Sequence, residues 1–139
     1  MIKITRYKKE DLKQIQSWWK EANFFVERPS QKWNNYVTSN KNVSVHCLHK
    51  QQKILSYIQC DVENKDAYIC VVTNPKYCRK GYGTKLMRYI ERKLKIQNIK
   101  NVYAYVELEN NSSINFFRKN KYIEKSRDSE FIYFAKCIK

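Results

Sequence analysis

The chain contains only two glycines, Gly81 and Gly83, and both lie within the stretch Asn74–Arg88. The apolar run Ala67–Val72 just before this stretch predicts a buried strand. Just after it, apolar side chains recur at helical spacing, at Leu86, Met87, Ile90 and Leu94. The sequence therefore predicts a strand, a tight turn that holds both glycines, and a helix.

A turn of this kind favours a negatively charged ligand. Glycine allows close approach of the backbone, and free N–H groups at a helix N-terminus attract anions. Arg79, Lys80 and Lys85 add positive charge. A P-loop is excluded because its second glycine is followed directly by Lys-Ser/Thr, whereas Gly83 is followed directly by Thr84, and the dinucleotide fingerprint needs a third glycine. We expect a phosphate-bearing ligand held mainly by backbone; the alternative is an ordinary basic turn.

The stretch resembles motif A of the GNAT acyltransferase superfamily, written Q/R-x-x-G-x-G/A. Here the motif reads Cys78-Arg79-Lys80-Gly81-Tyr82-Gly83, with Cys78 where Gln or Arg is usual. In that family the amides of the turn hold the pyrophosphate of acetyl-CoA. The resemblance implies contacts to this cofactor, the acyl donor, from Arg79, Lys80, Gly81, Tyr82, Gly83 and Thr84.

The other elements follow the order of the GNAT fold, β-α-α-β-β-β-α-β-α-β-β. Apolar alternation and apolar runs predict strands at Ile2–Tyr7, Val43–His49, Ile54–Glu63, Ala67–Thr73, Asn101–Leu108, Tyr122–Lys125 and Glu130–Ile138. Helical periodicity predicts helices at Lys9–Ala22, Gln31–Ser39, Thr84–Asn98 and Asn110–Asn120. The expected fold class is α/β (α+β): one domain over residues 1–139, with four helices and a mixed, mostly antiparallel sheet of about seven strands, the fourth and fifth of them splayed.

A second stretch resembles motif B of the same family, Asn-x-x-Ala-x-x-Leu/Phe-Tyr-x-Lys-x-Gly-Phe. Its positions are taken here by Asn110, Ser113, Phe116, Phe117, Lys119, Lys121 and Tyr122. The resemblance implies that Asn110, Ser113 and Phe117 contact the cofactor. It also implies that the backbone of Val71, Val72 and Thr73 pairs with its pantetheine arm.

The two usual catalytic groups of the family are missing from this chain. In many members the general acid is the motif B tyrosine, and here that position is Phe117. A frequent base is a glutamate in the fifth strand, and here that position is Tyr105. Strand alternation puts Tyr105 and Glu107 on one face, so these two are the predicted catalytic residues. Glu63 and His46 are alternative bases, and all four also fit structural roles.

Acceptor specificity in the family comes largely from the first two helices and the loop between them. In this chain the region carries Trp18, Trp19, Phe24, Phe25, Trp33 and Tyr36. Packing of helices on a sheet accounts best for Trp19 and Trp33. The loop residues Phe24 and Phe25 are therefore the predicted contacts to the acceptor.

The composition fits a protein of the reducing cytoplasm. The five cysteines form no C-x-x-C pair, so we expect neither zinc nor disulfides. No apolar run approaches the roughly 20 residues of a membrane helix, and we expect no membrane partner. The net charge of +15 favours anionic partners such as CoA or RNA, but the basic residues form no dense tract.

The predicted function is transfer of an acetyl group from acetyl-CoA to a primary amine of a small molecule or protein, by direct attack. One alternative is a transferase that acts on RNA or charged tRNA, which the net charge suggests. Another is a CoA-binding module with weak catalysis, which Phe117 and Tyr105 suggest. The chain is expected to be a monomer or a homodimer.

Overall fold

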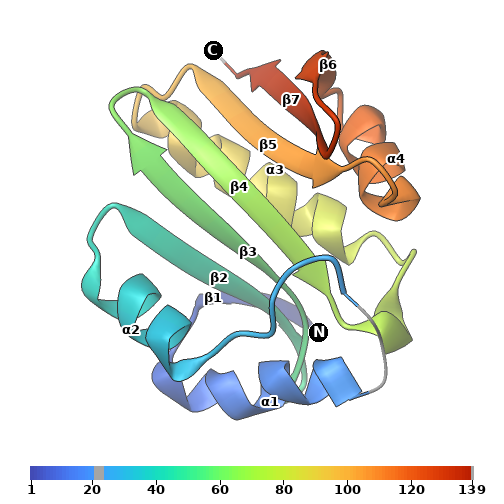
Figure 1. Ribbon diagram of the computed structural model, residues 1–139. Helices are drawn as coiled ribbons and strands as arrows, with labels where there is room; N and C mark the ends of the chain where they lie inside the picture. Colours follow the sequence, from blue (N-terminus) through green and yellow to red (C-terminus); the bar gives the residue numbers. More distant parts are fainter. Residues whose placement is uncertain (21–23, 139) are drawn as a thin grey trace.

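The computed structural model describes residues 1–20 and 24–138 (Figure 1). Its centre is a seven-stranded sheet in the order β1-β2-β3-β4-β5-β7-β6. The strands span Ile2–Arg6 (β1), Val43–Lys50 (β2), Lys53–Glu63 (β3), Asp66–Thr73 (β4), Asn101–Glu107 (β5), Ile123–Arg127 (β6) and Phe131–Cys137 (β7). All neighbours are antiparallel except β4 and β5, which are parallel. The predicted mixed sheet and order of elements are confirmed.

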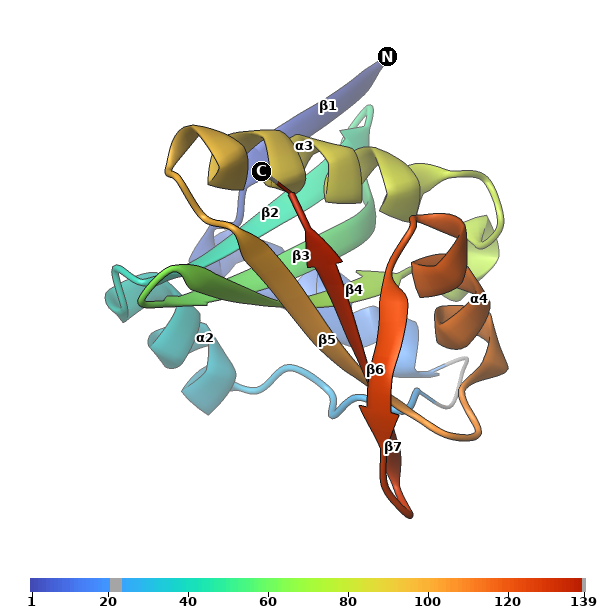
Figure 2. The ribbon, with the colours of Figure 1, turned by 90° about the horizontal axis from the view of Figure 1, so that it is seen from above.

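Helices cover both faces of the sheet (Figures 1 and 2). The α-helices span Leu12–Gln16 (α1), Gln31–Ser39 (α2), Tyr82–Ile96 (α3) and Asn111–Lys119 (α4), and 3₁₀ turns span Lys9–Asp11 (η1), Ser17–Lys20 (η2) and Pro75–Tyr77 (η3). We call the face under α3 and α4 the inner face; its core includes Leu86 and Phe134. The opposite, outer face packs on α1 and α2 through a second core that includes Ile15 and Tyr57.

The first helix differs from the prediction. The expected helix Lys9–Ala22 consists of η1, α1 and η2, and its last two residues lie outside the described part of the chain. Its buried apolar residues are Leu12, Ile15 and Trp18, which follow one another at intervals of three. A 3₁₀ turn has three residues per turn, so Trp18 is buried in the outer core, and the expected Trp19 packs half-buried against the same core.

Helices α3 and α4 end in the same left-handed motif. After α3, the N–H of Ile99 bonds to the carbonyl of Leu94, with Asn98 at φ +63°. After α4, the N–H of Tyr122 bonds to the carbonyl of Phe117, with Lys121 at φ +72°. Both are Schellman motifs, in which glycine is the usual left-handed residue. The strain is greater at Lys121, because asparagine tolerates this conformation better than lysine.

We expect Lys121→Gly to stabilise the protein, because a left-handed conformation costs a residue other than glycine roughly 1–2 kcal/mol. The free energy of unfolding from urea titration should rise by about 1 kcal/mol. Asn98→Gly is the matched control, with a smaller gain. Equal stability of parent and Lys121→Gly would show that the turn stores no strain.

Candidate active site

Strands β4 and β5 pair over only three residues, the last pair being Tyr68 with Tyr103. By contrast, β3 stays beside β4 as far as Thr73, and β7 stays beside β5 as far as Glu107. Each strand follows its other neighbour, so the two separate toward their C-terminal ends (Figure 1). We call the gap between them the slot; its closed end is where the strands pair, at Asp66–Tyr68, and its open end lies at Thr73 and Glu107. This confirms the predicted splay. Within the described chain, β4 has no strand partner on the β5 side over residues 69–73.

The three β4 residues predicted as cofactor contacts lie on this unpaired edge. Val71 packs half-buried against the inner core, and Val72 is buried in the outer core. The Thr73 hydroxyl shares a hydrogen bond of 2.9 Å with the Ser56 hydroxyl. Because these three side chains pack or hydrogen-bond within the protein, the groups of this edge that are available to a ligand are those of the backbone.

The turn from β4 into α3 exposes unpaired backbone N–H groups. Gly81 has φ +82°, is the N-cap of α3 and receives no side-chain cap. In the part of the chain that the structure describes, the N–H groups of Gly81, Tyr82 and Gly83 have no acceptor. A left-handed residue followed by a helical one directs successive N–H groups to the same side, which creates an anion-binding nest. The exposed side chains of Arg79 and Lys80 adjoin it.

Gly83 lies inside α3, so the prediction that both glycines sit in the turn is wrong for this residue. A Cβ at Gly83 would lie 3.0 Å from the Phe116 ring and 3.5 Å from Val71. The missing side chain therefore lets the first turn of α3 pack closely on α4 and β4. The neighbouring Thr84 hydroxyl accepts a 3.3 Å hydrogen bond from the Asn120 amide at the end of α4.

The residues predicted on α4 are engaged in the fold. The Asn110 side-chain oxygen caps α4 by accepting a 3.2 Å hydrogen bond from the N–H of Ser113. Phe117 is 5% exposed, and its ring stacks on Phe134 at 5.8 Å. This ring belongs to the apolar face of α4 and is part of the inner core.

Tyr105 and Glu107 lie on the outer face, as alternation predicts. Tyr105 is 59% exposed and makes edge contacts with the rings of Phe131 and Tyr133. Glu107 is half-buried at the open end of β5. Burial first, and then the Glu107 carboxylate, raise the pKa of Cys70 on β4 to about 11. Glu107 thus places negative charge across the divergence, and the Cys70 thiol stays protonated.

The other two candidate bases lie away from the open end of the slot. The His46 ring on β2 packs 5.3 Å from the Tyr89 ring of α3, on the inner face. Burial and nearby Lys93 lower the pKa of His46 to about 4. Glu63, at the end of β3, lies opposite Asp66 in the register of β3 and β4, at the closed end of β4. The structure therefore brings only Tyr105 and Glu107 to the divergence.

The two loop phenylalanines are placed differently. Phe24 packs on Trp19 with ring centroids 4.1 Å apart and adjoins the outer core. Phe25 is 50% exposed. Of the two predicted acceptor contacts, Phe25 is the one that offers its ring to a ligand.

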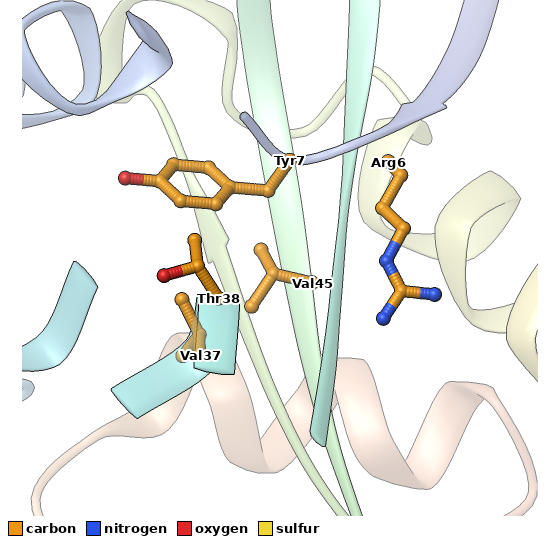
Figure 3. A pocket seen from close by; sticks show the side chains of 5 residues that line it. All are labelled: Arg6, Tyr7, Val37, Thr38 and Val45. Atoms are coloured by element: carbon orange, nitrogen blue, oxygen red, sulfur yellow. The ribbon is translucent and has the colours of Figure 1, made fainter. Parts of the chain in front are cut away.

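Two hollows lie outside the slot. The smaller, about 130 Å³, is lined by Tyr7, Val37, Thr38 and Val45, with Arg6 set apart from these four (Figure 3). The larger, about 270 Å³, lies beside α1, the start of β3 and η3. Neither includes a residue of β5. No helix in the described residues is long and apolar enough to span a membrane.

Solved structures of acetyltransferases share this architecture. The PaiA N-acetyltransferase of Thermoplasma acidophilum in complex with coenzyme A is 18% identical, with a TM-score of 0.82 over 99% of both chains. The ribosomal-protein-S18-alanine N-acetyltransferase of Escherichia coli is also 18% identical, with a TM-score of 0.84 over 99% of this chain and 94% of that one. At these identities the likeness shows a common fold. No curated protein matches significantly.

The sequence itself gives the family. A model of the acetyltransferase (GNAT) family matches residues 10–122, which include the turn, the divergent strands and the whole of α4. The chain therefore belongs to the acetyltransferase (GNAT) family and is an N-acetyltransferase that uses acetyl-CoA as its donor.

Proposed function

We propose that acetyl-CoA lies in the divergence between β4 and β5, with its pyrophosphate on the N–H groups of Gly81, Tyr82 and Gly83. The observation that carries this assignment is the continuity of two unpaired backbone surfaces, the edge of β4 and the uncapped start of α3. The first suits the amide groups of the pantetheine arm, and the second suits phosphate. Arg79 and Lys80 add positive charge, and Thr84, Asn110 and Ser113 border the site.

In the proposed reaction, a neutral amine attacks the thioester carbonyl directly. The C–N bond forms, the C–S bond breaks, and CoA leaves as a thiolate or thiol. A backbone N–H of the β4 edge stabilises the oxyanion that forms on the way. An acyl-cysteine route would need a reactive thiolate, and the raised pKa of Cys70 argues against one.

Glu107 is the proposed base that removes the proton from the attacking amine. Its position at the open end of β5 and its electrostatic effect on Cys70 across the slot support this role. Tyr105, two residues earlier on the same face, lines the approach of the acceptor. Phe117 has no proton to give and shapes the core behind the site. A thiol leaving group of pKa near 8.5 needs little help from an acid.

The chain is proposed to act as one domain in the cytoplasm, as a monomer or homodimer. Family membership favours an enzyme over a CoA-binding module. The half-buried carboxylate of Glu107 at the divergence argues against RNA as the acceptor, because it would repel phosphate.

The anion site is tested with Gly81→Asp and its neutral match Gly81→Asn. Both new residues tolerate a left-handed backbone better than most, and only Asp adds negative charge beside the pyrophosphate. In calorimetry with acetyl-CoA, Gly81→Asp should bind at least about tenfold more weakly than Gly81→Asn. Equal affinities of the two variants for acetyl-CoA would contradict the placement of the pyrophosphate at this turn.

Asn110 is tested with Asn110→Ala and Asn110→Ser. Serine keeps an N-cap oxygen and alanine does not, so only Asn110→Ala should lose about 1 kcal/mol of stability. If the Asn110 amide also contacts the cofactor, both variants should raise the KM for acetyl-CoA with little change in kcat. A normal KM in Asn110→Ser would restrict Asn110 to capping.

The base is tested with Glu107→Gln, with Glu109→Gln on the exposed loop after β5 as the matched control. Glu107→Gln should lower kcat by roughly 10²–10⁴-fold and flatten the acidic limb of the pH–rate profile. Acetyl-CoA affinity should stay at the parental value. Full activity in Glu107→Gln would exclude this carboxylate, and Tyr105→Phe would be measured in its place.

A further inference from the structure

The part of the outer face formed by β5 and β7 carries aromatic rings, and no helix of the described residues covers it (Figure 1). Three ring contacts join neighbouring strands on this face, one from β4 to β5 and two from β5 to β7. Tyr68 lies 5.4 Å from Tyr103, and Tyr105 lies 5.7 Å from Tyr133 and 6.3 Å from Phe131. We call these five residues the tyrosine face. An uncovered aromatic surface beside an active site is a place for a ligand to dock.

The charged side chains that the strands of the tyrosine face direct outward are opposite in sign to the net charge of the protein. Alternation and contacts show which side chains of four strand segments point outward: the part of β3 after Tyr57, and all of β4, β5 and β7. Four of these side chains are charged, and all four are acidic: Asp61, Glu63, Asp66 and Glu107. The one basic residue in these segments, Lys136, points inward to Glu91 of α3 at 3.0 Å.

The hairpin between β6 and β7 continues this acidic border. Asp128 accepts a 2.6 Å hydrogen bond from the Tyr133 hydroxyl, and Glu130 is exposed beside it. The nearby Arg127 is paired twice with Glu124, at 2.7 Å each. The side chains that these strands and the hairpin direct outward are therefore mainly acidic, whereas the exposed Lys65 and Lys100 flank the closed end, where their backbones bond at 3.2 Å.

We propose that the tyrosine face binds the acceptor as an extended peptide that carries Lys or Arg residues behind its reactive amine. This inference rests on the proposed function of the slot. The occupant is identified by charge complementarity, because acidic groups attract the cationic side chains and tyrosine rings bind cations over their faces. The same carboxylates repel RNA and anionic lipid.

The shape of the face favours a peptide over a small amine. Small ligands take concave pockets, and the two hollows described above lie off this face. The distance along the face from Glu107 at the slot to Asp66 at the closed end equals the length of β5, which has seven residues and is about 20 Å long at 3.3 Å per residue. With its amine at Glu107, a peptide of about six extended residues covers this length.

The test compares two peptides that share a free N-terminal alanine, one with Lys and Arg at the following positions and one with Glu. Each carries a fluorophore at its C-terminus. Fluorescence anisotropy with the full chain measures docking, and thiol release from acetyl-CoA measures transfer. We expect the basic peptide to bind at least about tenfold more tightly, with the preference falling as salt is raised. A linear polyamine is the small-molecule comparison.

Variants locate the binding surface. Glu63→Gln/Asp66→Asn and, separately, Tyr103→Leu should raise the KM for the basic peptide about five- to tenfold with kcat nearly unchanged. Glu10→Gln, an exposed acidic site on η1, is the matched control with parental KM. Equal binding of the two peptides, a better KM for the polyamine, or unchanged KM in both variants would overturn the inference.

Acetyl-CoA calorimetry separates this inference from the function on which it rests. Normal acetyl-CoA binding and transfer to a small amine, without preference for the basic peptide, would refute the peptide face alone. Docking of the basic peptide without acetyl-CoA binding would refute the slot assignment and leave the tyrosine face as a peptide site.

Discussion

The site depends on the early end of pairing between β4 and β5. A parallel pair continued to Thr73 would close the sheet and satisfy the backbone groups that now face the gap. Instead β3 holds β4 and β7 holds β5 over their full lengths, so neither strand bends back toward the other. Seven strands thereby form one sheet with an internal edge, and the N-terminus of α3 lies at the end of that edge.

The elements that sequence predicts best are those with strong local signals. Ser30 caps α2 by accepting a 3.1 Å hydrogen bond from the N–H of Trp33, and α2 spans the predicted residues. The turn before α3 follows from Gly81, which is the N-cap of the helix, although α3 begins two residues before the predicted Thr84. Both signals depend on residues within one turn of each other, which a sequence shows directly.

The predictions that failed depended on contacts that are distant in sequence. Trp18 is buried more deeply than Trp19 because the segment ends in a three-residue period, which a helical pattern of 3.6 does not reveal. Phe117 appears as a lost acid in the motif, but Phe134, from another strand, stacks on it in the core. Likewise, Gly83 is explained by Phe116, which lies on a helix more than thirty residues away. Sequence also gives no hint that acidic groups gather on one face, because alternation becomes informative only once strand order is known.

The internal edge also affects how the protein behaves before its ligand arrives. Unpaired strand edges act as templates for other strands, and the segment Ile69–Thr73 is a β-branched, largely apolar run of this type. A pantetheine arm bound in the gap as proposed would occupy the hydrogen-bonding groups that a second chain would otherwise use, and binding to the native state would add stability through mass action. On this assignment the donor substrate would also protect the protein against aggregation, and purification or storage without CoA would leave this edge open to other chains.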